Sequence, residues 1–322
     1  MSTTPWTLPV GAQVLGRVIS ATGEPLDGAG PLPTLVEATS RSVPPGYGQQ
    51  LETGIKVIDV FAPITVGSVV GIFSPPGAGK FVLMSELVER NARRYQGAAV
   101  LVGNEEHTIE VNDMMRTMRE AGVSEHMAMV FARSEDESAL RKQALHTGWA
   151  LAEDLAQANR PVLLFIDRQL ALEYAAAERR PASQPITVIY FDRQPDSEPT
   201  GAPTPLRLDT QINLNIELGR QKIWPAVDLH TSRSHLIEAG LASAEHLALV
   251  KRAQASLANA SDPIAQQVLV FGAQPFYTAE LYTGTPGEFV GLAAALADYA
   301  ALLDGKHADA ELESLRFVGR LK

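Results

Sequence analysis

Residues 74–81, with the sequence SPPGAGKF, combine residue types that can hold a phosphate group. Gly77, Ala78 and Gly79 offer backbone N–H groups, and glycine lets a backbone approach an anion closely. Lys80 adds an ammonium group, and a helix that begins there would add the favourable field of its N-terminus. These residues predict a phosphate-binding loop. The alternative is a simple strand-to-helix turn rich in glycine and proline.

The same segment departs from the phosphate-loop pattern G-x-x-x-x-G-K-[ST] at two positions. Ser74 replaces the first glycine, and Phe81 stands where a serine or threonine hydroxyl would hold Mg²⁺. Pro75 and Pro76 each remove one possible N–H donor. We therefore expect phosphate binding to survive better than magnesium binding.

Three acids and one arginine could complete phosphate chemistry. Asp167 ends the apolar run PVLLFID, where a buried strand would bring a carboxylate to the ligand-binding edge of a parallel sheet to serve Mg²⁺ through water. Glu106, with Glu105 as the competing residue, could orient or deprotonate an attacking water. The alternatives are helix capping for all three acids and a surface position for Arg233.

The composition limits the classes of function. The chain has 322 residues, 45% of them apolar, and a net charge of -10, which argues against nonspecific binding to nucleic acid or to an anionic membrane. It has no cysteine, which excludes disulfides and thiolate catalysis. Neither a signal peptide nor an apolar run of membrane-spanning length is recognisable, so we expect a cytoplasmic protein.

The hydrophobic pattern predicts strands that alternate with helices, and hence an α/β fold with a mainly parallel sheet. The expected strands include residues 69–73, 98–103, 161–167 and 186–192, with a strand-like run at 223–228. The expected helices start at Phe81 and cover about 109–121 and 135–158, and residues 190–208 are expected to form a loop. After about residue 240 the pattern becomes helical.

Several longer segments, in the same order along the chain, resemble the rotary ATP synthase beta subunit. They are LETGIKVIDVFAPI (51–64), GNEEHTIEVNDM (103–114), VLLFID, IWPAVD and QPFYTAELYTGTPGEFV (274–290). The phosphate loop, with its paired prolines, is more similar to that of the transcription terminator Rho, and both proteins belong to the RecA-like superfamily. The resemblance implies a lead-in segment at 1–50, a RecA-like nucleotide-binding domain at 51–240 and a small helical domain at 241–322.

The resemblance also implies roles for individual residues around ATP or ADP. Lys80 would contact the beta and gamma phosphates, Glu106 would position the hydrolytic water, and Asp167 would serve Mg²⁺. Arg233 matches the position of an arginine finger that one subunit offers to its neighbour, although the segment before it is shorter than in the family. Arg179 lies near the position of a further phosphate-sensing arginine.

Three aromatic residues would enclose the adenine in a protein of this family. They are Trp224, Phe276 and, less firmly, Phe271. Core packing is the alternative for each of them.

The departures from the family shape the expected function. His107 replaces an arginine beside the catalytic glutamate, the β-barrel that forms the crown of the hexamer is missing from the start, and the acidic lever that pushes on the rotor is missing. We expect a nucleotide-binding protein with weak or no hydrolysis and no torque generation, in a homo-oligomer or in a hetero-oligomer with related subunits. The alternatives are an active homo-oligomeric ATPase for secretion, remodelling or translocation, and a scaffold that binds no nucleotide.

Overall fold

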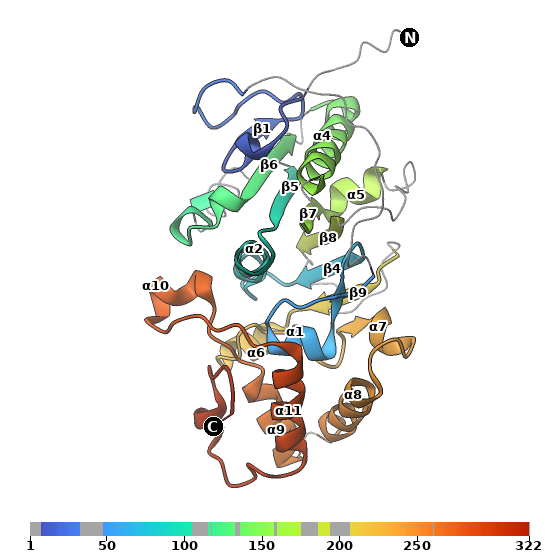
Figure 1. The fold of residues 1–322 in the computed structure, drawn as a ribbon, viewed down its shortest axis with the longest axis vertical. Coiled ribbons are helices and arrows are strands. Elements are labelled where there is room, and N and C mark those ends of the chain that lie inside the picture. The colour runs from blue at the N-terminus through green and yellow to red at the C-terminus, as the bar shows by residue number, and fades with distance from the viewer. Residues whose placement is uncertain are drawn as a thin grey trace. The chain divides into compact units, whose positions relative to one another are not determined.

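The computed structural model describes residues 8–32, 48–104, 115–116, 118–132, 136–157, 160–174, 186–193, 207–259 and 261–321. The chain divides into two compact units (Figure 1). The first contains Met1–Gly48, Val66–Ser68 and Asn91–Phe191, and the second contains Gln49–Thr65, Val69–Arg90 and Asp192–Lys322. These units divide the chain differently from the three predicted segments, because the helices after residue 240 share a unit with the phosphate loop.

The first unit is a parallel sheet with helices packed on it. Its strands follow the order β1-β6-β5-β7-β8, and the pairs within this order for which the register is given are parallel. Helix α4 packs against β5, β6 and β7, and α5 packs against β7. The bounds are β1 (Val18–Ser20), β5 (Ala98–Asn104), β6 (Met127–Ala132), β7 (Val162–Asp167), β8 (Ile186–Arg193), α4 (Ser138–Ala156), α5 (Arg168–Tyr174) and the 3₁₀ turns η1 (Ala12–Val14) and η2 (Ser124–His126).

The second unit contributes strands β4, β9 and β10, the last three in the order of the eight-stranded sheet, together with helices. Strand β4 (Val69–Ser74) pairs in parallel with β9 (Thr210–Asn213), which pairs in antiparallel fashion with β10 (Arg233–Ser234). A two-stranded antiparallel sheet is formed by β2 (Gln50–Leu51) and β3 (Ile64–Thr65). Helix α2 (Lys80–Tyr95) begins in this unit, and its residues from Asn91 onward are grouped with the first.

Four of the remaining helices of the second unit, α1, α8, α9 and α11, pack around its apolar core. Helix α11 packs against α1, α8 and α9, and α8 also packs against α9. The bounds are α1 (Lys56–Phe61), α6 (Ile216–Arg220), α7 (His235–Glu238), α8 (Ala244–Leu257), α9 (Pro263–Phe271), α10 (Glu280–Thr283), α11 (Leu292–Leu303) and the 3₁₀ turns η3 (Tyr277–Ala279) and η4 (Leu312–Leu315). Ser243 and Asp262 start α8 and α9 with side-chain caps, as short polar residues do at helix N-termini.

The predicted α/β class and the mainly parallel sheet are confirmed. The predicted strands before and after the phosphate loop, the helix that follows it, the long helix at 135–158 and the C-terminal helices are found as β4, β5, α2, α4, α8, α9 and α11. The helix predicted at about 109–121 lies largely outside the described residues.

One local prediction was wrong. Residues 223–228 form no strand and contribute only an isolated bridge between Leu214 and Val227. Pro225 lacks the N–H that a ladder needs, which explains why this apolar run does not extend a sheet. The strand predicted at 186–192 is found as β8, which ends at Arg193, and most of the loop predicted after it lies outside the described residues.

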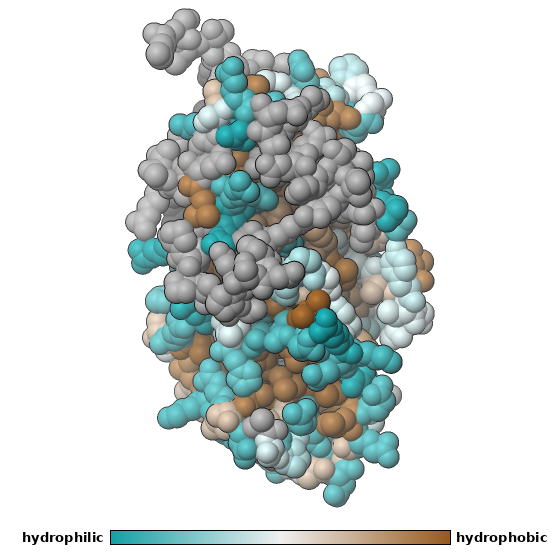
Figure 2. Space-filling view, turned by 180° about the vertical axis from the view of Figure 1, so that it is seen from behind, coloured by the Kyte–Doolittle hydropathy of each residue, from teal (hydrophilic) through white to brown (hydrophobic). Residues whose placement is uncertain are grey.

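The molecular surface is mixed in polarity. On the face drawn in Figure 2, brown hydrophobic patches lie between teal hydrophilic residues. Within the described ranges, no helix combines the length and the apolar character needed to cross a membrane.

Candidate functional site: the phosphate loop and its surroundings

The phosphate loop lies where the sequence predicts it, between β4, which ends at Ser74, and α2, which begins at Lys80. Gly77 and Gly79 have φ angles of 82° and 84°, in the left-handed region that favours glycine. The N–H of Ala78 donates to the carbonyl of Pro75 at 3.3 Å, which closes a turn inside the loop. The loop therefore has the sharp bend of an anion cradle, although the Ala78 N–H is engaged within the loop itself.

Lys80 is the first residue of α2 and is 7% exposed. Its Nζ lies 5.1 Å from the centroid of the Phe81 ring, within the range of a cation–π contact. The half-buried ring stands where the phosphate-loop pattern has a hydroxyl. A positive charge is thus kept at the helix N-terminus, next to an apolar group instead of a metal ligand.

Trp224 packs directly on the phosphate loop. A Cβ atom placed on Gly79 would lie 2.6 Å from Cζ3 of the indole, and one on Gly219 would lie 2.8 Å from Cη2. Both distances are too short for a real Cβ, so these two glycines let the half-buried indole approach the backbone. One predicted adenine residue is therefore in contact with the predicted phosphate loop.

The other two aromatic residues have different surroundings. Phe271 is 0% exposed, stands edge-to-face against Tyr299 at 5.0 Å between ring centroids, and has the Nζ of Lys56 at 3.6 Å from its centroid. This environment agrees with the core-packing alternative for Phe271. Phe276 is 6% exposed, and the guanidinium carbon of Arg90 lies 5.7 Å from its ring centroid.

Asp167 and Arg233 lie in different units. Asp167 is the last residue of β7, and its Oδ1 accepts the N–H groups of Gln169 at 2.9 Å and Leu170 at 3.3 Å, so the carboxylate caps α5. Arg233 begins β10 and is exposed. A magnesium role for Asp167 stays a prediction.

Four residues with predicted roles or departures lie outside the described residues. They are Glu105, Glu106, His107 and Arg179.

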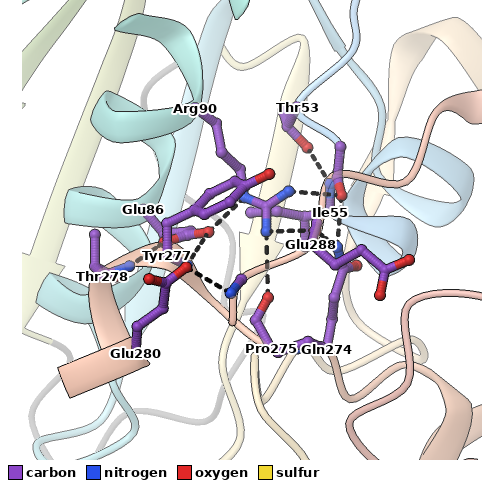
Figure 3. A network of polar contacts seen from close by, with 12 residues as sticks. Thr53, Ile55, Glu86, Arg90, Gln274, Pro275, Tyr277, Thr278, Glu280 and Glu288 are labelled. Carbon is purple, nitrogen blue, oxygen red and sulfur yellow. Dashed lines mark hydrogen bonds and ion pairs between the residues drawn. The ribbon is translucent and has the colours of Figure 1, made fainter. Parts of the chain in front are cut away.

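A buried ion pair on α2 was missed by sequence reasoning (Figure 3). Nε of Arg90 lies 2.6 Å from Oε1 of Glu86, and the two side chains are 1% and 0% exposed. The guanidinium also donates to the carbonyls of Gly54 at 2.8 Å, Glu288 at 3.0 Å and Pro275 at 3.4 Å. The charge of Arg90 is therefore surrounded by acceptors, as a buried charge requires.

Glu86 is bonded as thoroughly as its partner. Its carboxylate accepts the N–H groups of Tyr277 at 3.1 Å and Thr278 at 3.0 Å, and the hydroxyl of Thr278 at 3.0 Å. The only sequence signal for the pair is the i,i+4 spacing of opposite charges, which is common on solvated helix faces.

Two further titratable groups are buried on α1. Burial lowers the pKa of Lys56 to about 7, against the opposing effect of Asp298 and Glu288, and its Nζ donates to the carbonyl of Val318 at 2.5 Å. Burial raises the pKa of Asp59 to about 7, although its carboxylate accepts three hydrogen bonds from Thr53 and Gly54. Both groups lie on α1, before the phosphate loop, and not in the loop itself.

The residues of the phosphate loop do not fit a magnesium ion held by the protein. The side chain of Phe81 has no oxygen to offer, and one oxygen of Asp167 is occupied in capping α5. Among the residues with a described position, no group of three or more His, Asp or Glu side chains could hold a metal ion. The loop and its neighbouring side chains are therefore better suited to an anionic phosphate and a stacked nucleotide base than to a metal ion.

A comparison with known protein families agrees with nucleotide binding in this region. Residues 54–184 match the model of the ATP synthase alpha/beta family, nucleotide-binding domain. The matched range contains the phosphate loop, Glu86, Arg90 and Asp167, and it ends before Trp224 and Phe276. The resemblance to the ATP synthase subunits that the sequence motifs indicate is thereby confirmed over residues 54–184, where the chain is similar to the nucleotide-binding domain of that family.

Proposed function

We propose that this protein binds an adenine nucleotide, ATP or ADP, and hydrolyses it slowly or not at all. The observation that carries the proposal is the contact of Trp224 with Gly79, one residue before Lys80. A cation for phosphate and an aromatic side chain for a base thus meet at the same short loop, the first at its end and the second packed against it. A base stacked on an aromatic side chain gains roughly 1–3 kcal/mol, and a charge-assisted hydrogen bond to phosphate gains about as much.

The proposal of weak hydrolysis rests on the residue at position 81. A nucleotide bound to this loop would meet the ring of Phe81 in place of a hydroxyl, so Mg²⁺ would be held by the phosphates and water alone. Phosphoryl transfer depends on electrostatic stabilisation of the developing charge, which includes the metal. Turnover should suffer more than affinity does.

A protein with these properties would serve as a ligand-switched scaffold or as a subunit of a larger assembly, without generating torque. The competing hypothesis is an active homo-oligomeric ATPase. Its support is the exposure of Arg233, which leaves that guanidinium accessible to a neighbouring subunit's nucleotide. A non-binding scaffold is the third hypothesis, and the Ala78 N–H engaged within the loop is consistent with it.

A titration with a turnover assay separates the three. The binding arm uses a variant with Trp6→Phe and Trp149→Phe, so that emission reports on Trp224 alone, and titrates ATP, ADP and inorganic triphosphate with Mg²⁺ present. We expect saturable quenching by both nucleotides and little turnover. Robust turnover that vanishes in Glu106→Gln supports the active ATPase instead, and no binding of any probe supports the scaffold.

A further inference from the structure

We propose that the Glu86–Arg90 ion pair is a positioning element that fixes the base-binding end of the nucleotide site relative to the phosphate loop. The inference rests on the proposed function and deepens it by naming residues that would let the site bind a nucleotide more tightly than a polyphosphate without a base. Neither residue would touch the ligand. Both would act through Phe276 and Trp224.

The pair holds the backbone on both sides of Phe276 (Figure 3). Arg90 donates to the carbonyl of Pro275, which immediately precedes Phe276, and its guanidinium lies 5.7 Å from the Phe276 ring. Glu86 accepts the N–H groups of Tyr277 and Thr278, which immediately follow it. The residue between these anchors has little freedom to shift along α2.

Gln274 extends the same network to the indole on the phosphate loop. Its N–H donates to the carbonyl of Trp224 at 2.8 Å. Its side-chain Nε2 donates to the carbonyls of Gly54 at 2.7 Å and Glu288 at 2.6 Å, which are the same two carbonyls that accept from Arg90. Arg90 and Gln274 therefore share acceptors, and the backbones of both aromatic residues are joined to one polar network.

The place of the pair on α2 links this network to the phosphate end. Lys80, Glu86 and Arg90 lie on one continuous helix. With a rise of 1.5 Å per residue, Glu86 lies about 9 Å and Arg90 about 15 Å along the axis from Lys80. Because the helix is stiff, it sets the separation between Lys80, which would meet phosphate, and the segment that carries Phe276, which would meet the base.

The burial of the pair is better explained by a role in positioning residues 275–278 than by a contribution to the stability of the whole fold. Replacing a buried ion pair with well-packed apolar residues is often neutral or favourable for stability, so its presence calls for another explanation. Here each charge is matched to backbone groups at one register of the 275–278 segment. A shift of that segment would leave buried charges without partners, and so one position of Phe276 is selected.

The test compares two ligands that share phosphates but differ in the base. Calorimetry would measure the Kd of MgATP and of inorganic triphosphate with magnesium for wild type, Glu86→Gln and Arg90→Lys, with Arg94→Lys on the exposed surface of the same helix as the control. We expect Kd for ATP to rise about tenfold in the two pair variants, within the range of one lost base–aromatic contact. Kd for triphosphate should change by less than about twofold in both.

A second set of variants keeps the inference falsifiable if one of these folds poorly. In a Phe276→Ala background, Glu86→Gln should weaken ATP binding by far less than it does alone, because its effect passes through that ring. Equal losses of ATP and triphosphate affinity, or full additivity with Phe276→Ala, would overturn the inference and leave nucleotide binding intact. A wild type that binds neither ligand would overturn the proposed function, and the inference with it.

Discussion

The two ends of the proposed nucleotide site, both served by α2, are built differently. At the phosphate end, Lys80 is in contact with an apolar ring, and the side chain at the position that would hold a metal has no oxygen. At the base end, the Glu86–Arg90 pair satisfies its buried charges with six acceptor or donor groups of the backbone and of Thr278. These polar contacts thus fix the side chains at the base end more fully than the side chains at the phosphate end, where hydrolysis would occur.

The proposed function separates binding from catalysis within one loop-and-helix unit. The glycines and Lys80 would suffice for an anion site, because backbone shape and one charge are enough to attract phosphate. Hydrolysis needs further groups that position a metal and a water. The following predictions test how far the two ends differ.

The largest effect is expected from breaking the base end. Arg90→Met leaves the carboxylate of Glu86 buried without its cation, and removing one partner of a buried pair costs about 3–5 kcal/mol. Urea unfolding would measure the loss. The matched control is Arg252→Met, whose ion pair with Asp304 is exposed and should be worth less than about 1 kcal/mol. Equal losses in the two variants would remove the distinction between the buried pair and a surface pair.

The next effect concerns Lys56, whose backbone N–H donates to Gln274 of the base-end network. Its pKa is about 7 in the folded protein against an ordinary value of 10.5. Between these values the unfolded chain binds more protons, so the free energy of unfolding should rise with pH, by at most about 1.4 kcal/mol per unit. Below pH 7, Lys56 is protonated in both the folded and the unfolded state, so it adds no pH dependence to the free energy of unfolding.

Urea unfolding at intervals from pH 7 to 9 would detect this rise, and Lys56→Met should flatten it. Asp59 gives the opposite slope at lower pH, because its folded pKa of about 7 lies above its ordinary 3.8, so stability should fall as pH rises from 4 to 7. Asp59→Asn should remove the fall in stability from pH 4 to 7 and leave the rise from pH 7 to 9 in place. A slope from pH 7 to 9 that is unchanged in Lys56→Met would refute the assignment.

At the phosphate end, Lys80→Ala should weaken ATP and inorganic triphosphate alike. A hydrogen bond between charged groups is worth about 1.5–3 kcal/mol, so both Kd values should rise roughly 10- to 150-fold. Lys251→Ala, at an exposed position of α8, serves as the control. If Lys80→Ala affected only ATP, Lys80 would be serving the base and not the phosphates.

The smallest effect is expected from restoring the missing hydroxyl. Phe81→Thr supplies an oxygen where the phosphate-loop pattern has one, so Mg²⁺ should strengthen ATP binding severalfold more in the variant than in wild type. Phe81→Ala removes the ring without adding oxygen and should not gain this dependence. A Phe81→Ala variant that behaves like Phe81→Thr would show that the ring, and not the absent hydroxyl, limits the metal.

The sequence was sufficient to locate the phosphate loop, because a strand, a glycine pair, a lysine and a helix follow one another within a few residues. It also predicted the α/β class, since strand and helix periodicities are local properties. It could not identify the Glu86–Arg90 pair as buried, because the partners of that pair at Pro275, Tyr277 and Thr278 are nearly 200 residues away. Charges four residues apart look the same whether they face water or a core.

The aromatic residues show a similar limit. The family-like motif gave a firmer expectation for Phe276 than for Phe271, and Phe271 packs on Tyr299 with no exposed surface, whereas Phe276 borders the ion pair. The run at 223–228 suggested a strand because its residues are apolar, and the missing N–H of Pro225 prevailed over that pattern. Tertiary packing decided the first outcome, and the backbone chemistry of one residue decided the second.

The most direct test of the central claim is a titration of the variant with Trp224 as its sole tryptophan, using MgATP and, separately, inorganic triphosphate. The account predicts saturable quenching of Trp224 emission by ATP, tighter apparent binding for ATP than for triphosphate, and little release of phosphate during the titration. Emission that does not change with saturating ATP, or equal affinity for the two ligands, would contradict the claim that this loop and its indole form a nucleotide site.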